Sequence, residues 1–253
     1  MNKIVFSVWM GLVMMHANAS EQSNELLLGA GPYFQAQPYQ GAEVEVMPTP
    51  VAFYDNGIFY VRWVRAGLYF WGDKGEASSW GFSLTAQPRP FGYESGDASV
   101  LAGMNERNRS WEGGLSFAAS SDLGYIEFLY LTDLQDNSNG SLISGEVGKK
   151  YTSGKWMFWP SVSATWFSDD FNDYYYGVSP NEASVSLNRP AYQASSSVSF
   201  AIQTYVIYEI SHHWQLFGYL RGDVLGEAVR DSPIVGDDYM VSGTLSLLYK
   251  FGL

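Results

Sequence analysis

The chain alternates apolar and polar side chains over short stretches, most clearly in the C-terminal stretch 241–251. Val241, Leu245 and Leu247 share one parity there, whereas Ser242 and Ser246 share the other. Because side chains of a strand alternate between two faces, the stretch predicts a strand with one apolar and one mostly polar face. About ten residues are what a tilted strand needs to cross a bilayer.

The same alternation recurs along the chain and predicts further strands. They are expected at 26–35, 44–54, 58–71, 80–87, 111–120, 125–132, 142–151, 156–167, 195–210 and 214–225. Pro48 and Pro50 cannot donate a backbone hydrogen bond, so we expect their strand to be irregular or near an edge of pairing. A regular strand would place Arg62 and Arg65 on opposite faces, so we expect a bulge or break there.

These stretches favour an all-β, antiparallel transmembrane β-barrel. Eleven strands are evident, but a barrel with both ends on one side needs an even number. The break near Arg62 is the expected source of the missing strand, so we predict twelve strands, with ten as the alternative. Short turns (121–124, 152–154, 211–213) alternate with longer loops (88–109, 133–141, 168–190, 226–238), as in outer-membrane barrels. The loop 168–190 is the longest segment without expected regular structure.

A soluble β-sandwich or lipocalin-like barrel would also alternate, but with charged residues opposite the apolar ones. Here those residues are mostly Ser, Thr, Gly and Gln, which suits a barrel lumen. Charged residues make up 16% of the chain, against about 25% in soluble domains. Aromatic residues near the expected strand ends, such as Trp80, Trp111 and Trp214, suit the girdles of a membrane barrel.

The N-terminus has the features of a secretory signal peptide. A positive charge at Lys3 precedes an apolar run, and Ala17-Asn18-Ala19 matches a cleavage site. We therefore expect a signal peptide at 1–19 and a single outer-membrane barrel at 20–253, with both ends of the mature chain in the periplasm. Cysteine is absent, and the net charge of -12 disfavours nucleic acid as a partner.

One segment resembles a known family. Residues 169–192 read DDFNDYYYGVSPNEASVSLNRPAY, and residues 231–235 read DSPIV. Together with the GAGPY at 29–33, these motifs resemble the MipA/OmpV family, the MltA-interacting proteins of Gram-negative outer membranes. The matching residues are Asp169, Asp170, Tyr175, Tyr176, Gly177, Val178, Ser179, Glu182, Ala183, Pro190 and Tyr192.

The resemblance implies a non-enzymatic scaffold. Its role would be to link a lytic transglycosylase, which is a murein hydrolase, to a penicillin-binding protein, which is a murein synthase. Lipid and lipopolysaccharide of the outer membrane would surround the barrel. The alternatives are a small-solute channel, a ligand-binding barrel, or a surface adhesin that acts through its long loops.

Candidate functional residues fall into two groups, and we expect no catalytic residue, metal or cofactor. The candidate lumen charges are Glu112, Glu127, Arg221, Asp223 and Lys250. Unpaired, they would favour a wet pore, whereas ion pairs among them would plug it. The candidate loop contacts are Asp169, Asp170, Tyr174, Tyr175 and Tyr176, which could bind a ligand or simply fold the loop. His212 and His213 point to opposite sides of an extended chain and are poorly placed to share a metal.

Overall fold

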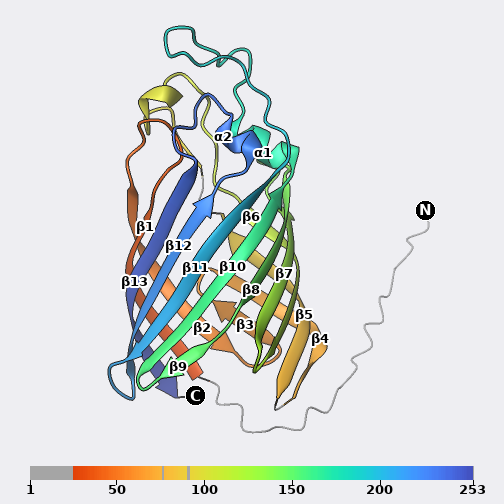
Figure 1. Cartoon of the computed structure of the whole chain (residues 1–253), viewed down its shortest axis with the longest axis vertical. Coiled ribbons are helices and arrows are strands. Elements are labelled where there is room, and N and C mark those ends of the chain that lie inside the picture. Colours follow the sequence, from red (N-terminus) through yellow and green to blue (C-terminus); the bar gives the residue numbers. More distant parts are fainter. Residues whose placement is uncertain (1–24, 76, 90–91, 253) are drawn as a thin grey trace, which may run out of the picture.

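The computed structural model describes residues 25–75, 77–89 and 92–252. They form a closed antiparallel β-barrel whose strands are tilted relative to the barrel axis (Figure 1). The predicted signal peptide lies outside the described residues. Strands that follow each other in the chain pair with each other, except that β8 and β9 both pair with β10, and pairing of β1 with β13 closes the wall. The strands are β1 (Glu25–Gln35), β2 (Glu45–Asp55), β3 (Phe59–Arg62), β4 (Arg65–Lys74), β5 (Ser78–Pro88), β6 (Trp111–Ser121), β7 (Gly124–Asp133), β8 (Ser141–Gly148), β9 (Tyr151–Ser153), β10 (Trp156–Phe167), β11 (Ser197–Glu209), β12 (Trp214–Val224) and β13 (Tyr239–Gly252).

The barrel has twelve strands, as predicted. β8 and β9 both pair with β10, so these two of the thirteen segments form one interrupted strand. The interruption falls at Lys149 and Lys150, where the backbone N–H of Lys149 donates to the carbonyl of Pro160 at 3.2 Å. The sequence pattern predicts this strand without the interruption.

The expected break near Arg62 is a tight turn between β3 and β4. Arg62 and Arg65 are register partners across this turn, so both point to the same side of the sheet. Trp63 occupies the turn with a φ of 58°, a left-handed conformation that is uncommon for a bulky residue. The predicted run 58–71 is therefore two strands, which accounts for the even count.

β2 is only partly paired on the side that faces β3. It pairs with β1 along its length, but with β3 only from Phe53 to Asp55, and Ala52 accepts from the backbone N–H of Trp63 at 2.8 Å. Even-numbered residues of β2 therefore direct their backbone groups to this side. Pro48 and Pro50 pair with β1 but fall on the stretch that has no strand partner on the β3 side among the described residues, which confirms the prediction of an edge.

The two ends of the barrel differ. One end, at the top of Figure 1, carries the long connections, and we call it the loop end. The other end carries short turns and the C-terminal end of β13, and we call it the turn end. The loop end holds a 3₁₀ turn (Ser99–Leu101) and the helices α1 (Asp169–Tyr176) and α2 (Glu227–Arg230). The expectation that 168–190 lacks regular structure is therefore wrong at α1.

The two faces of the wall differ as the alternation predicts. On β13, Leu245 and Leu247 point outward and are 55% and 45% exposed, whereas Ser246 and Leu248 point into the lumen and are almost fully buried. Apolar side chains are exposed in the same way on the other strands. Among the described residues, no helix is long and apolar enough to cross a membrane.

Candidate functional site in the lumen and the loop cap

All five candidate lumen charges point inward, and each has a partner of opposite charge. Glu127 accepts from Arg65 at 2.8 Å and lies 3.9 Å from Arg62. Its partners come from the β3–β4 hairpin, so this ion pair joins strands that are not neighbours in the wall.

The remaining candidate charges are also paired. Glu112 binds Arg89 where both side chains are almost fully buried. Arg221 donates to Asp223 at 2.7 Å, and Lys250 lies 2.6 Å from Glu25 at the turn end. From the sequence we expected unpaired charges in a wet pore and ion pairs in a plugged lumen. The pairing of all five charges therefore favours a plugged lumen.

Apolar and aromatic side chains fill the lumen nearer the turn end. Val51, Phe217 and Leu248 are buried at the centre of this cluster, which we call the lumen plug. Trp63 reaches in from the β3–β4 turn, and its ring centroid lies 5.1 Å from that of Tyr219 and 5.9 Å from that of Phe217. The strained turn thus carries the ring that crosses the lumen.

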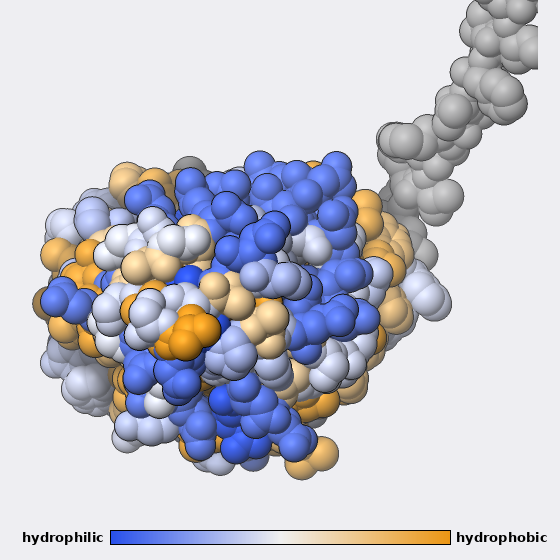
Figure 2. Space-filling model, turned by 90° about the horizontal axis from the view of Figure 1, so that it is seen from above, coloured by the Kyte–Doolittle hydropathy of each residue, from blue (hydrophilic) through white to orange (hydrophobic). Residues whose placement is uncertain are grey.

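A second cluster closes the loop end, and we call it the loop cap. Its buried core combines residues from all the long connections except the one between β7 and β8. The members are Tyr39, Tyr93, Ala98, Val100, Leu101, Met104, Phe171, Tyr175, Tyr176, Val178, Leu225, Val229, Ile234 and Met240. Figure 2 shows this end from above, covered by loop residues of mostly hydrophilic character. Burial raises the pKa of Tyr39 well above its usual value, because its phenol lies among other tyrosines.

Helix α1 positions the candidate loop contacts. Ser168 caps it, and its hydroxyl accepts from the backbone N–H of Phe171 at 3.2 Å. Asp169 and Asp170 lie exposed in the first turn, where carboxylates suit the positive end of the helix dipole.

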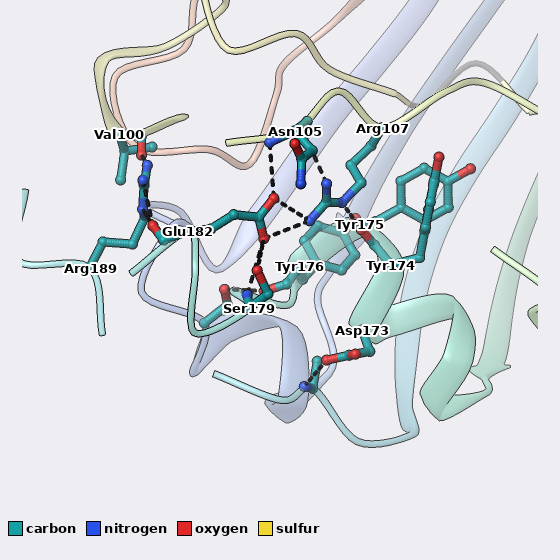
Figure 3. Close-up of polar contacts among 12 residues, drawn as sticks. Val100, Asn105, Arg107, Asp173, Tyr174, Tyr175, Tyr176, Ser179, Glu182 and Arg189 are labelled. Carbon is teal, nitrogen blue, oxygen red and sulfur yellow. Dashed lines mark hydrogen bonds and ion pairs between the residues drawn. The ribbon is translucent and has the colours of Figure 1, made fainter. Parts of the chain in front are cut away.

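The three tyrosines of α1 face the interior of the cap. Tyr175 and Tyr176 are 1% and 6% exposed and belong to its core. The carbonyl of Tyr174 accepts from Arg107 Nε at 2.6 Å, and its hydroxyl accepts from the N–H of Asn108 at 2.8 Å (Figure 3). Their contacts fold the loop against the barrel mouth, and the two aspartates remain free to contact solvent.

Glu182 is the polar centre of the cap (Figure 3). It accepts from the N–H groups of Asn105 and Ser179 and forms an ion pair with Arg107 at 3.0 Å. Burial alone would raise the pKa of Glu182, but these donors and the charge of Arg107 outweigh it and lower the pKa to about 2.

Arg189 joins two connections of the cap. Its guanidinium donates to the carbonyls of Val100, Ala102 and Glu182, and the side chain is 2% exposed. It holds a short hairpin, closed by a bridge between Ser184 and Arg189, that stands above the cap.

The second motif, 231–235, packs against the first. The hydroxyl of Ser232 donates to the carbonyl of Tyr176 at 2.6 Å, and Ile234 is fully buried. Tyr192 donates to the carbonyl of Ala228 at 2.8 Å. The motifs at 169–192 and 231–235 therefore contribute much of the cap, whereas the GAGPY at 29–33 lies on β1.

No metal site appears in the described part of the chain, where no three His, Asp or Glu residues cluster suitably. His212 and His213 lie exposed in the β11–β12 turn, and the ring of His213 stacks on Tyr249 with a centroid distance of 5.6 Å.

The reasoning from sequence missed three arginines that organise these clusters: Arg89, Arg107 and Arg189. Arg107 lies 75 residues from Glu182 in the chain, and no local pattern marks such a pair. The sequence did offer one signal, because the chain has few charged residues. An arginine that is buried in such a chain needs a partner of opposite charge.

A closed antiparallel barrel with an apolar outer face and a filled lumen defines a membrane β-barrel protein. The family model for MltA-interacting protein MipA matches residues 28–251, and the chain belongs to this family. Both its fold and the names of its relatives identify it as an outer-membrane protein.

The comparisons extend over most of the chain. It is 28% identical over 242 residues to the MltA-interacting protein of Escherichia coli, covering 95% of this chain and 96% of that protein. The outer membrane protein OmpV of Vibrio cholerae is 24% identical over 179 residues, which are 70% of this chain and 68% of OmpV. Among solved structures, a Pseudomonas aeruginosa FadL homologue gives a TM-score of 0.43 at 10% identity and covers 91% of this chain and 90% of that one.

Proposed function

We propose that this protein is a non-enzymatic scaffold in the outer membrane that links a lytic transglycosylase to a penicillin-binding protein during peptidoglycan synthesis. Its relation to the MltA-interacting protein over almost the whole chain supports a murein hydrolase as one partner. The synthase as second partner is implied by the resemblance of the motifs at 169–192 and 231–235 to those of the MipA/OmpV family.

The observation that carries the proposal is the filled lumen. The lumen plug and the loop cap occupy the two halves of the barrel, and the candidate lumen charges are paired. Side chains packed into both halves of the barrel favour a structural role over a channel. Ion pairs inside a barrel also stiffen it, because breaking one would leave an unpaired charge.

A scaffold needs an exposed surface on the side of its partners. We propose that the turn end faces the periplasm, as short turns do in outer-membrane barrels. Two of its turns present apolar side chains to solvent: Ile58 is 69% exposed and Leu123 is 87% exposed. Exposed apolar side chains on short, rigid turns suit contact with a folded protein.

Capture of the murein hydrolase from crosslinked envelopes tests the proposal. The double variant Ile58→Asp/Leu123→Asp should reduce capture at least tenfold, since two apolar contacts are each worth about 1 to 2 kcal/mol. Val185→Asp is the matched control, because Val185 is fully exposed at the loop end. Equal capture by wild type, the double variant and an unrelated barrel would contradict the proposal.

A further inference from the structure

Three cations share two carboxylates on the inner face of the wall near the turn end. Lys74 lies 3.3 Å from Asp55, and Arg62 lies 3.5 Å from the same carboxylate. Arg62 also lies 3.9 Å from Glu127, which binds Arg65. These five residues therefore carry one positive charge in excess, although the net charge of the whole chain is -12.

The excess charge is open to solvent. The side chains of Lys74 and Arg62 are 51% and 43% exposed, whereas that of Glu127, deeper in the lumen, is 15% exposed. The hydroxyl of Tyr69 accepts from Arg62 at 2.6 Å, and the Nζ atom of Lys74 lies 5.7 Å from the centroid of the same ring. The Tyr69 side chain thus holds both cations at the edge of the lumen.

Lys150 is a further exposed cation at this end, in the connection between β8 and β9 (Figure 1). Its Nζ atom lies 5.2 Å from the ring centroid of Trp159, which shares the inward parity of the buried Ser161 on β10. No carboxylate lies within 4.0 Å of Lys150 in the described part of the chain. We call Arg62, Lys74 and Lys150 the cationic rim.

The cationic rim adjoins Ile58, one of the exposed apolar side chains to which the proposed function gives a protein contact. Ile58 lies in the β2–β3 turn, and its carbonyl accepts from the backbone N–H of Tyr69 at 2.9 Å. The turn end therefore presents an apolar side chain beside exposed cations. Because the rim belongs to the inner face, the lipids that surround the outer face of the barrel do not meet this combination.

We propose that the cationic rim and Ile58 form a docking surface for an acidic segment of the murein hydrolase. The inference rests on the proposed function and adds to it the charge of the partner. Complementary charges select a partner and speed its encounter, and here they offset the repulsion between an acidic segment and a chain of net charge -12.

The arrangement of the rim favours an extended segment over a small anion. Its cations come from β3, from β4 and from the β8–β9 connection, so they do not converge on one point. A small anion is held by donors that converge on its oxygens, whereas a segment with several carboxylates can reach separate cations. Ile58 supplies an apolar contact that a folded protein can match and a free anion cannot.

Binding of the purified lytic transglycosylase to the full-length protein in detergent, measured at low and at high salt, tests the proposal. The variant Lys74→Gln/Lys150→Gln should weaken binding about fivefold at low salt and much less at high salt, because salt screens exposed charges. Arg109→Gln/Arg230→Gln is the matched control. It removes two exposed cations at the loop end and should leave the affinity unchanged.

Equal binding by the wild type and the rim variant, or an equal loss in the loop-end control, would overturn the docking surface and leave the scaffold role intact. Absence of binding by the wild type would overturn the scaffold role and the docking surface with it. Cosedimentation of the wild type with protein-free murein, lost in the rim variant, would also overturn the proposal, because murein carboxylates would then be the occupant. Both variants are first checked for a native barrel by heat-modifiable electrophoresis.

Discussion

Arg65 donates to Glu127 at 2.8 Å across the lumen, from the β3–β4 hairpin to β7. The pair depends on the turn at Trp63, which places Arg65 on the inner face together with Arg62. The hairpin thus supplies both the cations that neutralise Glu127 and the indole that enters the lumen plug. One local feature of the wall organises much of the interior.

Glu127→Gln should destabilise the barrel by about 2 to 3 kcal/mol. The substitution keeps the size of the side chain but leaves Arg65 with an unpaired buried charge, which costs more than the pair contributes. Urea unfolding in lipid vesicles measures the change. The double variant Arg65→Met/Glu127→Gln should regain part of the loss, and a double variant as unstable as the sum of its parts would contradict this account.

The loop cap should loosen at low pH because of Glu182. Its pKa is lowered to about 2 in the folded protein, so its ionised form stabilises the cap above about pH 4.5, and this contribution is lost as the pH falls toward 2. The shift corresponds to about 3 kcal/mol. The protection of the amides of residues 177–192 against hydrogen exchange, corrected for the intrinsic pH dependence of exchange, should therefore fall between about pH 4.5 and 2.

The variant Glu182→Gln should show fast exchange in the same segment at neutral pH. Glu106→Gln is the control, because Glu106 is exposed in a connection that contributes to the cap. Exchange that is equally slow in both variants would show that Glu182 does not hold the cap.

Gly29 should tolerate no side chain. A Cβ at this position would overlap the carbonyl oxygen of Leu247 on β13, where the first and last strands close the barrel. Gly29→Ala should therefore impair assembly, seen as loss of the heat-modifiable folded form. Gly218→Ala is the matched control, since its nearest neighbour would lie 3.9 Å away and folding should be unchanged.

Pro48→Thr and Pro50→Thr should each destabilise the protein in a bilayer. Each adds an N–H to the open edge of β2, and an unsatisfied N–H in the hydrocarbon region costs several kcal/mol. Unfolding in vesicles should show a larger loss than for Val46→Thr, which adds a hydroxyl but no backbone donor. A stable Pro48→Thr variant would indicate that the edge is covered.

Much of the wall could be predicted from sequence, because lipid and lumen impose opposite demands on alternate residues. The predicted strand 156–167 agrees with β10 at both ends, and the break at Arg62 followed from the faces of two charges. The interruption at Lys149 was not predicted, since nothing in the alternation changes there.

The interior could be predicted only in part. Alternation indicated which charges point inward, but their partners lie on distant strands and in loops, as Arg89 does for Glu112. Helix α1 was missed because its Asp, Asn and Tyr residues have weak helix propensity. Its stability comes from the Ser168 cap and from burial of Phe171 and Tyr175, which only the tertiary structure provides.

The central claim is that the barrel is filled and serves as a scaffold, and planar-bilayer recording of the purified protein tests it most directly. With the lumen plug and the loop cap in place, the wild type should produce no reproducible unitary current steps, although the folded protein is present in the bilayer. Reproducible steps of one size in the wild type would contradict the account and favour a channel.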